Sequence, residues 1–369
     1  MNIHILGSAT TSFGELWERS LMSLFAEAVE AALNDAKLEP ADIEAAFIAN
    51  KAAGSYENQH HLNALVSQLF PHFPPSVRVE GACASGSLAM IAAELALLSG
   101  RYKTVMVVGA EKMTDVSSQE TTTILSGAAD TSTEVGSTFP ALYALLAKSH
   151  IKSYHTTREQ LSAVAVKNHH HALSNPRAQF HKEISLEQVT KSQLISDPLR
   201  LLDCSPVSDG AAAVILSTQP VKGKTKLLGF GQAQDSVSLA GRSSLTSLRA
   251  TKVAMDQALK DSGVSRDQLQ AAEIHDCFTI AEILAIEDLG FFGPGEGGPA
   301  TLEQRTTIGG KIVINPSGGL KGCGHPVGAT GVKQIAFLND YILRGDANVA
   351  LAHNVGGSGA TAVVHILGK

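Results

Sequence analysis

The sequence predicts an α/β protein made of two related halves, each a layered arrangement of helices and mixed sheet. Two glycine-rich loops indicate this, GACASG at residues 81–86 and GCGHPVGATG at residues 322–331. Each loop is followed by an apolar helix-like stretch, by a glycine fourteen residues after the loop's last glycine, and by a short hydrophobic strand. The same order of signals in both halves indicates an internal duplication of two copies.

Two further stretches repeat at one constant spacing. Residues 45–48 (AAFI) match 271–274 (AAEI), and residues 32–35 (ALND) match 258–261 (ALKD), both 226 positions apart. The glycine-rich loops are 245 positions apart, so the copies differ by an insertion. We expect two such copies to pack about a pseudo-twofold axis, which would bring the two loops toward a shared centre.

The order of elements predicts where the halves begin and end. Residues 1 to about 115 are expected to form strand, helix, strand, loop, helix and strand, and the region from about 222 onward repeats that order. Between them, residues 112–200 are rich in Ser, Thr, His and Gln. We therefore predict an N-terminal half over residues 1–221, with a loop domain inserted at about 112–200, and a C-terminal half over residues 222–369.

The composition excludes several classes of protein. With 369 residues, 17% of them charged and 44% hydrophobic, the chain is long enough for two buried cores and unlike a disordered protein. A net charge of −6 gives no electrostatic reason to expect a nucleic acid or an anionic membrane as partner. The N-terminus lacks the features of a signal peptide, and the four cysteines are not spaced as a disulfide framework, so we expect a cytoplasmic location.

Cys83, in the first glycine-rich loop, is the first candidate catalytic residue. It lies where a predicted strand turns into a helix, and the small residues around it allow a ligand to approach the backbone. The positive end of the helix dipole is expected to favour its thiolate form. The alternative is a small buried core residue, as free cysteines often are, and this loop alone leaves both interpretations open.

His325, in the second glycine-rich loop, favours the catalytic interpretation because the duplication places it opposite Cys83. Pro326 after it fits the first turn of a helix. A thiol needs a base to become a reactive nucleophile and later to regain its proton. We therefore expect Cys83 and His325 to form a nucleophile and base at the pseudo-twofold axis.

A third motif, EIHDCF at residues 273–278, directly follows a predicted strand. His275 and Cys277 could be two metal ligands, but no second cluster with zinc-like spacing completes a site, so we predict no metal. An active-site lining that transfers protons or donates hydrogen bonds is favoured instead. The other cysteines, Cys204 and Cys323, are interpreted as core residues. The three consecutive histidines 169–171 cannot share one helix face and are predicted at the surface of the loop domain.

Together these motifs resemble the thiolase superfamily, and within it the sterol-carrier-protein-type and archaeal-type thiolases. The resemblance covers essentially the whole chain, including residues 168–180 and 203–206. It implies the duplicated thiolase fold and an acyltransferase that thiolyses 3-ketoacyl-CoA or, in reverse, condenses acetyl-CoA in a Claisen reaction. Acyl-CoA and CoA would be its substrates, with no further cofactor. It also implies a homodimer or homotetramer, with the strand at 104–109 as a possible interface edge.

The resemblance implies a role for each residue of the first two motifs. Cys83 would attack the acyl-CoA and hold the acyl group as a thioester, and His325 would activate that cysteine and help to polarise the substrate carbonyl. The backbone N–H groups of Cys83 and Gly356 would form an oxyanion hole. The residues that bind CoA remain unknown, and four basic residues are candidates without a supporting motif, namely Arg177, Lys182, Arg242 and Arg249.

The chain departs from most thiolases at two motifs. It has His-Asp-Cys-Phe at 275–278 where most carry Asn-Glu-x-Phe, and Asn-Val-Gly at 354–356 where most carry Cys-x-Gly. The usual second catalytic cysteine is therefore missing. By resemblance, Cys277 would take over its acid/base role, and His275 with His325 would complete a second oxyanion hole.

Two other functions stay open. A thiolase-like acyltransferase or aldol lyase could act on another substrate with a small OB-fold partner protein, although we expect the lyases to lack the nucleophilic cysteine. A non-catalytic subunit of a complex is the other alternative. Its expected sign is the loss of Cys83, His275 or His325, and all three are present.

Overall fold

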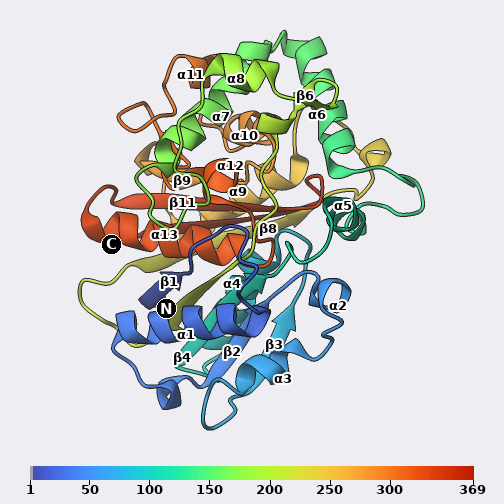
Figure 1. The fold of residues 1–369 in the computed structure, drawn as a ribbon. Helices are drawn as coiled ribbons and strands as arrows, with labels where there is room; N and C mark the ends of the chain where they lie inside the picture. The colour runs from blue at the N-terminus through green and yellow to red at the C-terminus, as the bar shows by residue number, and fades with distance from the viewer. Residues whose placement is uncertain (1–2) are drawn as a thin grey trace.

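The computed structural model describes residues 3–369. One mixed sheet runs through both halves of the protein (Figure 1). The strand order is β10-β9-β11-β12-β8-β1-β7-β4-β2-β3. The first half contributes β1 (Ile3–Thr10), β2 (Ala45–Ala49), β3 (Ser76–Val79), β4 (Thr104–Glu111) and β7 (Gly210–Ser217). The second half contributes β8 (Lys226–Gln234), β9 (Ala271–Glu273), β10 (Val313–Ile314), β11 (Val349–Gly356) and β12 (Thr361–Gly368).

This strand order is symmetric about its centre, where β1 meets β8. There Ile3 pairs with Leu227 and His4 with Lys226. Outward from this contact, β7, β4, β2 and β3 on one side correspond to β12, β11, β9 and β10 on the other. The predicted α/β class and duplicated fold are confirmed, whereas the boundary between residues 221 and 222 stays a prediction.

Helices form layers on both sides of each half-sheet. In the first half, α1 (Leu21–Ala36) packs on β1 and β7, and in the second half α9 (Arg249–Ser262) packs in the same way on β8 and β12. The other pair of related helices, α4 (Ser85–Leu98) and α13 (Thr330–Arg344), pack against each other between the halves.

The helices α4 and α13 approach each other very closely at their N-terminal ends. A Cβ on Gly86 would lie 2.7 Å from the backbone nitrogen of Gly331, so neither position has room for a side chain. These are the last glycines of the two glycine-rich loops, and they are equivalent in the duplication. The loops of Cys83 and His325 therefore meet at the pseudo-twofold axis, as the repeat predicted.

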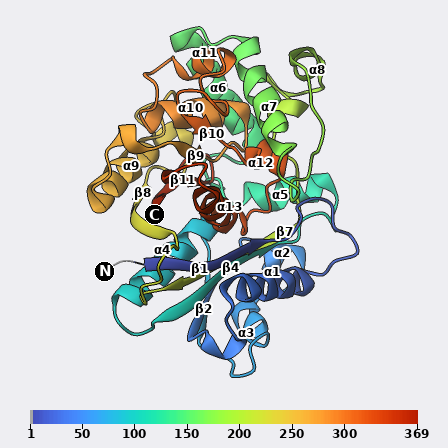
Figure 2. The same ribbon diagram turned by 90° about the vertical axis from the view of Figure 1, so that its left-hand side faces the viewer.

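The segment between β4 and β7 is mostly helical and packs largely on the second half, at the top of Figure 2. It comprises α5 (Ser118–Ser126), α6 (Phe139–Tyr154), α7 (Arg158–Ala172), α8 (Leu186–Lys191), β5 (Leu194–Ser196) and β6 (Leu199–Arg200). Its central helix α7 contacts α10 (Thr279–Asp288), α11 (Gly297–Leu302) and α12 (Gly319–Cys323). Two short helices of the first half are α2 (Ala53–Tyr56) and α3 (Leu62–Ser67).

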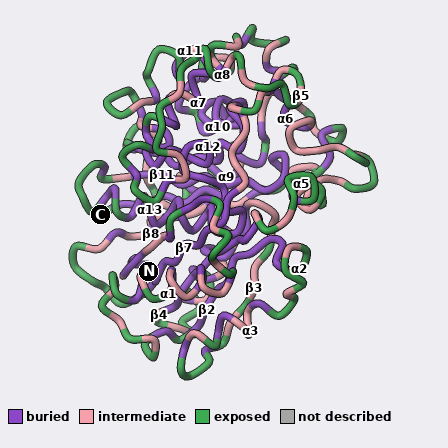
Figure 3. Tube along the Cα trace, viewed as in Figure 1, coloured by how far each residue is buried: buried purple, intermediate pink, exposed green. Residues whose placement is uncertain are grey.

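The buried residues follow this layering, because the interior elements are covered on both sides (Figure 3). Every residue of α10 is buried, although the helix carries Glu282, Glu287 and Asp288. Within residues 3–369, no helix combines the length and the apolar character needed to cross a membrane.

Two sequence-based expectations about the surface are wrong. The strand at 104–109 is part of β4, which lies between β7 and β2, so it offers no free edge. Among the three histidines, His169 and His171 are only 4% and 2% exposed, and only His170 is exposed. The reason is that α7 is covered by neighbouring helices on more than one side, so two of three successive side chains point inward.

The two buried histidines give the protein a predictable acid sensitivity. Burial lowers the pKa of His171 to about 3 and that of His169 to about 4, so both are neutral in the folded protein. Below pH 6.5 these histidines bind protons in the unfolded chain but stay neutral in the folded protein. The free energy of unfolding therefore decreases as the pH falls. For one such histidine the loss at pH 5 is about 2 kcal/mol.

We expect His171→Gln to reduce this loss. Between pH 7 and pH 5, the free energy of unfolding measured in urea should fall by about 2 kcal/mol less in the variant than in the wild type. His170→Gln, on the exposed face of the same helix, is the matched control and should follow the wild type. An equal fall in His171→Gln and wild type would contradict the assignment of His171 as a buried neutral group.

Candidate active site

Cys83 sits in a tight turn between β3 and α4. Ala82 adopts left-handed backbone angles, with φ of +53°, which is strained for a residue with a side chain. The turn is held by Ser85, whose hydroxyl accepts a hydrogen bond from the Gly81 N–H at 3.0 Å and donates one to the Ala82 carbonyl at 2.6 Å. A short polar side chain at the start of α4 thus fixes the loop that carries the thiol.

His325 lies just past the end of α12, in a loop fastened to the first half. Gly324 ends the helix with φ of +113°, a conformation that requires glycine. The His325 backbone N–H donates to the Ser208 hydroxyl at 2.9 Å. Further along the loop, the Gly328 N–H donates to the buried Glu111 carboxylate, also at 2.9 Å. Both acceptors come from the other half of the chain, so packing of the halves positions the imidazole.

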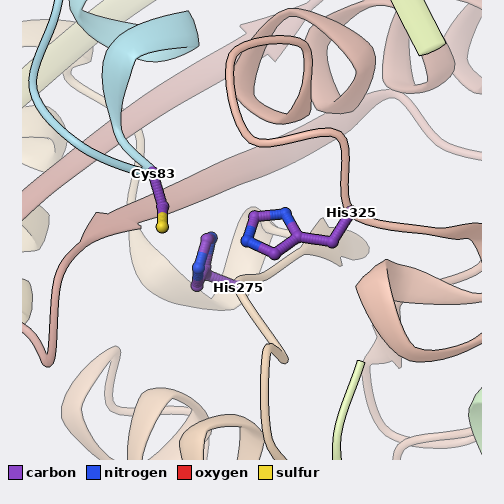
Figure 4. A group of neighbouring side chains, drawn as sticks. All are labelled: Cys83, His275 and His325. Atoms are coloured by element: carbon purple, nitrogen blue, oxygen red, sulfur yellow. The ribbon is translucent and has the colours of Figure 1, made fainter. Parts of the chain in front are cut away.

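The structure brings Cys83, His275 and His325 together at the interface of the halves (Figure 4). One ring nitrogen of each histidine and the Cys83 sulfur all lie within 4.8 Å of one another. The two imidazole rings meet edge to face, with centroids 5.0 Å apart and an angle of 85°. The three side chains come from the loops before α4, after β9 and after α12.

The hydrogen bonds of His325 fix which of its nitrogens carries the proton. Its Nδ1 lies 2.7 Å from the Thr330 hydroxyl oxygen, and that hydroxyl donates its own proton to the Pro326 carbonyl at 2.9 Å. Since the hydroxyl proton is already used, Nδ1–H must be the donor to Thr330. The Nε2 atom of His325 is therefore unprotonated and available as a base.

Both members of the pair are neutral at rest. Burial raises the pKa of the Cys83 thiol, and this effect exceeds the opposing influence of the Lys51 cation and of the Gly357 N–H. Burial also lowers the pKa of His325 to about 3. The expectation that the helix N-terminus would favour a resting thiolate is therefore wrong, because desolvation dominates. A base is needed to take the thiol proton.

Cys83, Cys277 and His325 line one small, mainly apolar cavity of about 160 Å³. Tyr143 and Phe278, whose rings stack at 4.6 Å, form part of its wall. Cys277 is buried, and burial raises its pKa well above the usual range. A larger cavity of about 540 Å³ reaches Cys323, but no histidine is among the described residues that line it.

Both halves of the chain match models of a known protein family. A family model described as the thiolase N-terminal domain matches residues 3–220, and one described as thiolase C-terminal domain-like matches residues 231–369. The chain belongs to the thiolase family.

Individual members extend this result. An acetyl-CoA acetyltransferase from Methanothermobacter thermautotrophicus is 43% identical over 388 residues, covering 100% of both chains. A solved structure titled Ltp2-ChsH2(DUF35) aldolase has a TM-score of 0.85 at 25% identity, covering 100% of this chain and 98% of the other. The human mitochondrial 3-ketoacyl-CoA thiolase has a TM-score of 0.79 at 18% identity, covering 100% and 99%. The predicted resemblance and the acyltransferase class are confirmed.

The other two cysteines of this thiolase differ from each other. Cys323 is 1% exposed, lies 3.4 Å from the Asn175 amide nitrogen and is a core residue, as predicted. Cys204 is only partly buried and lines the cavity of Cys83, so its prediction as a core residue is wrong. Ser205, which follows it on the way to β7, lines the same cavity, and its N–H donates to the Cys277 carbonyl at 2.9 Å.

Three polar contacts of the thiolase site lie outside the sequence-based assignment. The buried Asp276 accepts hydrogen bonds from the Leu320 and Lys321 N–H groups, in the first turn of the helix that leads to His325. The third is at Gly357, next to the predicted Gly356, and here the Gly357 carbonyl accepts a hydrogen bond from the Tyr143 hydroxyl at 3.2 Å. No local sequence pattern indicates these contacts of Asp276, because Leu320 lies 44 residues further along the chain.

The guanidinium of Arg242 is hydrogen bonded to backbone carbonyls near the site, so Arg242 is a poor candidate for binding the CoA phosphate. Its guanidinium donates to the Ser236 carbonyl at 3.0 Å and to the Ser358 carbonyl at 2.7 Å. These bonds hold the hairpin turn after β11 that supplies Gly357. For Arg177, Lys182 and Arg249 the CoA assignment stays a prediction.

Proposed function

We propose that this chain is a thiolase that cleaves 3-ketoacyl-CoA with CoA and, in reverse, condenses two acetyl-CoA molecules through a thioester on Cys83. The observation that supports this is the convergence of the Cys83 thiol with an unprotonated His325 Nε2 at a small cavity that Cys277 also lines. A thiol, a base and a second proton donor are the groups that this chemistry requires.

Cleavage begins with the transfer of the Cys83 proton to His325 Nε2. The sulfur then attacks the 3-keto carbon, and the backbone N–H groups of Cys83 and Gly356 stabilise the oxyanion that forms. Each such donor contributes roughly 3 kcal/mol to the barrier reduction. Because the thiol is protonated at rest, attack and proton transfer are coupled.

The second event breaks the bond between the second and third carbons of the substrate. The electron pair moves to the departing acetyl-CoA, whose thioester oxygen carries enolate charge. His275 and the newly protonated His325 donate hydrogen bonds to that oxygen. Cys277 gives its proton to the second carbon and becomes a thiolate, so acetyl-CoA leaves and the acyl group stays on Cys83.

The final step returns both protons to their starting places. The thiol of CoA attacks the thioester on Cys83 and transfers its proton to the Cys277 thiolate. Cys83 leaves as a thiolate and regains its proton from His325. The products are acyl-CoA and the resting enzyme, and the Claisen condensation is the same sequence in reverse.

A cytoplasmic homo-oligomer, with or without a small OB-fold partner, completes the proposal. The similarity to a structure titled Ltp2-ChsH2(DUF35) aldolase supports such a partner, and it also favours the aldol lyase as the second candidate function. The presence of Cys83, which we expect a lyase of this type to lack, favours the thiolase.

The deciding experiment is CoA-dependent thiolysis of acetoacetyl-CoA by the purified protein alone. We expect turnover, together with formation of acetoacetyl-CoA from acetyl-CoA when the product is continuously removed. Turnover only after addition of a DUF35-type protein would establish the partner. Release of an aldehyde or ketone from a β-hydroxyacyl-CoA, without thiolysis, would overturn the proposal in favour of a lyase.

A further inference from the structure

Asn354, at the end of β11, links the backbone of the Cys83 loop to the ring of His275. Its side chain is fully buried. Its amide nitrogen Nδ2 lies 3.0 Å from the Cys83 carbonyl oxygen and 3.1 Å from His275 Nδ1. A carbonyl oxygen can only accept, so the NH2 group of Asn354 must face this side. Its second hydrogen then points at His275 Nδ1, which is the acceptor.

This contact determines the tautomer of His275. A neutral imidazole carries one proton, and a ring whose Nδ1 accepts must carry it on Nε2. The Nε2 atom of His275 is buried, and none of the described protein atoms hydrogen bonds to it. An N–H group left without an acceptor in a buried site is costly unless a ligand oxygen supplies one. The site therefore holds a free donor.

His325 has the opposite arrangement. Its Nδ1–H donates to Thr330, which leaves a lone pair on Nε2. Two histidines that face each other at 5.0 Å thus present different atoms, one a base and the other a donor. The two histidines therefore differ only in their hydrogen-bond partners. Thr330 makes His325 a base, and Asn354 makes His275 a donor.

We propose that Asn354 is the positioning residue that holds His275 as the Nε2–H tautomer, which makes His275 a donor to a substrate carbonyl oxygen and prevents it from ligating a metal. The first consequence rests on the proposed function, whereas the second does not. Asn354 stands at the place where most thiolases carry the cysteine of Cys-x-Gly, so this chain uses the position to direct a histidine instead.

The metal part of the proposal follows from the same three side chains. The ligand atoms of Cys83, His275 and His325 are close enough to share one cation, and thiolate with imidazole is a donor set suited to Zn²⁺ or Co²⁺. A histidine binds a metal through a nitrogen lone pair. With its Nδ1 facing Asn354 and its Nε2 protonated, His275 offers none.

Asn354→Asp tests this with almost no change in shape. A carboxylate cannot donate to His275 Nδ1, so the ring must donate instead and its lone pair moves to Nε2. Carboxylate, histidine and metal then form the arrangement common in metal sites. With Co²⁺ as the probe, we expect at least about tenfold tighter binding than in the wild type and a thiolate-to-cobalt absorption band. That band should vanish when Cys83→Ala is added.

Nitrogen-15 NMR of histidine-labelled protein reads the tautomer directly. We expect His275 protonated on Nε2 in the wild type and on Nδ1 in Asn354→Asp, with thiolysis slowed about 100-fold in kcat. Asn339→Asp, a buried change on α13 away from the site, is the control and should behave as wild type in both assays. A wild-type His275 protonated on Nδ1, or equal Co²⁺ affinity in Asn354→Asp and wild type, would overturn the proposal.

The two readouts also separate this proposal from the proposed function. NMR and Co²⁺ binding need no acyl-CoA, so they stand even if the protein fails to thiolyse acetoacetyl-CoA. If Asn354→Asp does not fold, the wild-type spectrum alone decides between the two tautomers. An active wild-type enzyme whose His275 is protonated on Nδ1 would refute Asn354 as the positioning residue without contradicting the proposed thiolase activity.

Discussion

Cys83→Ala is expected to lower kcat for acetoacetyl-CoA thiolysis by roughly 10⁴-fold or more, because it removes the atom that forms the covalent intermediate. The thioester is also directly visible. Mass spectrometry after mixing with acetoacetyl-CoA should show one acetyl group on the wild type and none on the variant.

The matched control is Cys204→Ala. Cys204 lines the same cavity and also carries a thiol whose pKa burial raises, to about 12. It does not belong to the cluster of ligand atoms that Cys83 forms with the two histidines. We expect this variant to acylate and turn over within about threefold of the wild type, as for a side chain without a direct role. Acylation of Cys83→Ala to the wild-type extent would rule out the covalent scheme.

The meeting of Cys83 and His325 could be predicted from the sequence because the duplication is visible in the spacing of glycines. Gly86 and Gly331 match in sequence, and in the fold they are in contact. A pair of equivalent positions near a twofold axis must lie close to each other, so the repeat carries three-dimensional information that a single loop lacks. For His275 the sequence indicated only an active-site lining, because its motif directly follows a predicted strand, and the role itself came from the family resemblance.

Other features depend on packing that no local pattern records. The inward direction of His169 and His171 is set by helices from the second half, more than a hundred residues away. The strand at 104–109 reads as an edge until β7 returns from beyond the insertion to cover it. The tautomers of His275 and His325 depend on Asn354 and on Thr330, and only the folded chain shows which of their atoms face the rings.

The Cys277→Ala variant is expected to separate the two halves of the reaction. Cys83 and His325 are untouched, and without Cys277 the leaving CoA thiolate can take the proton that His325 has removed from Cys83. Transfer of an acyl group from acetyl-CoA to Cys83 should therefore remain within about tenfold of the wild-type rate. Proton transfer to or from the second carbon then lacks its donor, and a positioned acid or base contributes about 10²- to 10⁴-fold. Thiolysis and Claisen condensation should both fall by that factor.

Exchange of labelled CoA into acetyl-CoA measures acylation alone, because no carbon–carbon bond is made or broken. We expect this exchange to survive in Cys277→Ala and to vanish in Cys83→Ala, which gives each thiol its own signature. Exchange and condensation that fall together in Cys277→Ala would mean that His325 cannot replace Cys277 in protonating CoA, so that Cys277 is required for acylation as well. Normal condensation would instead leave His325 to move both protons, and Cys277 would then serve only to shape the cavity that it lines with Tyr143.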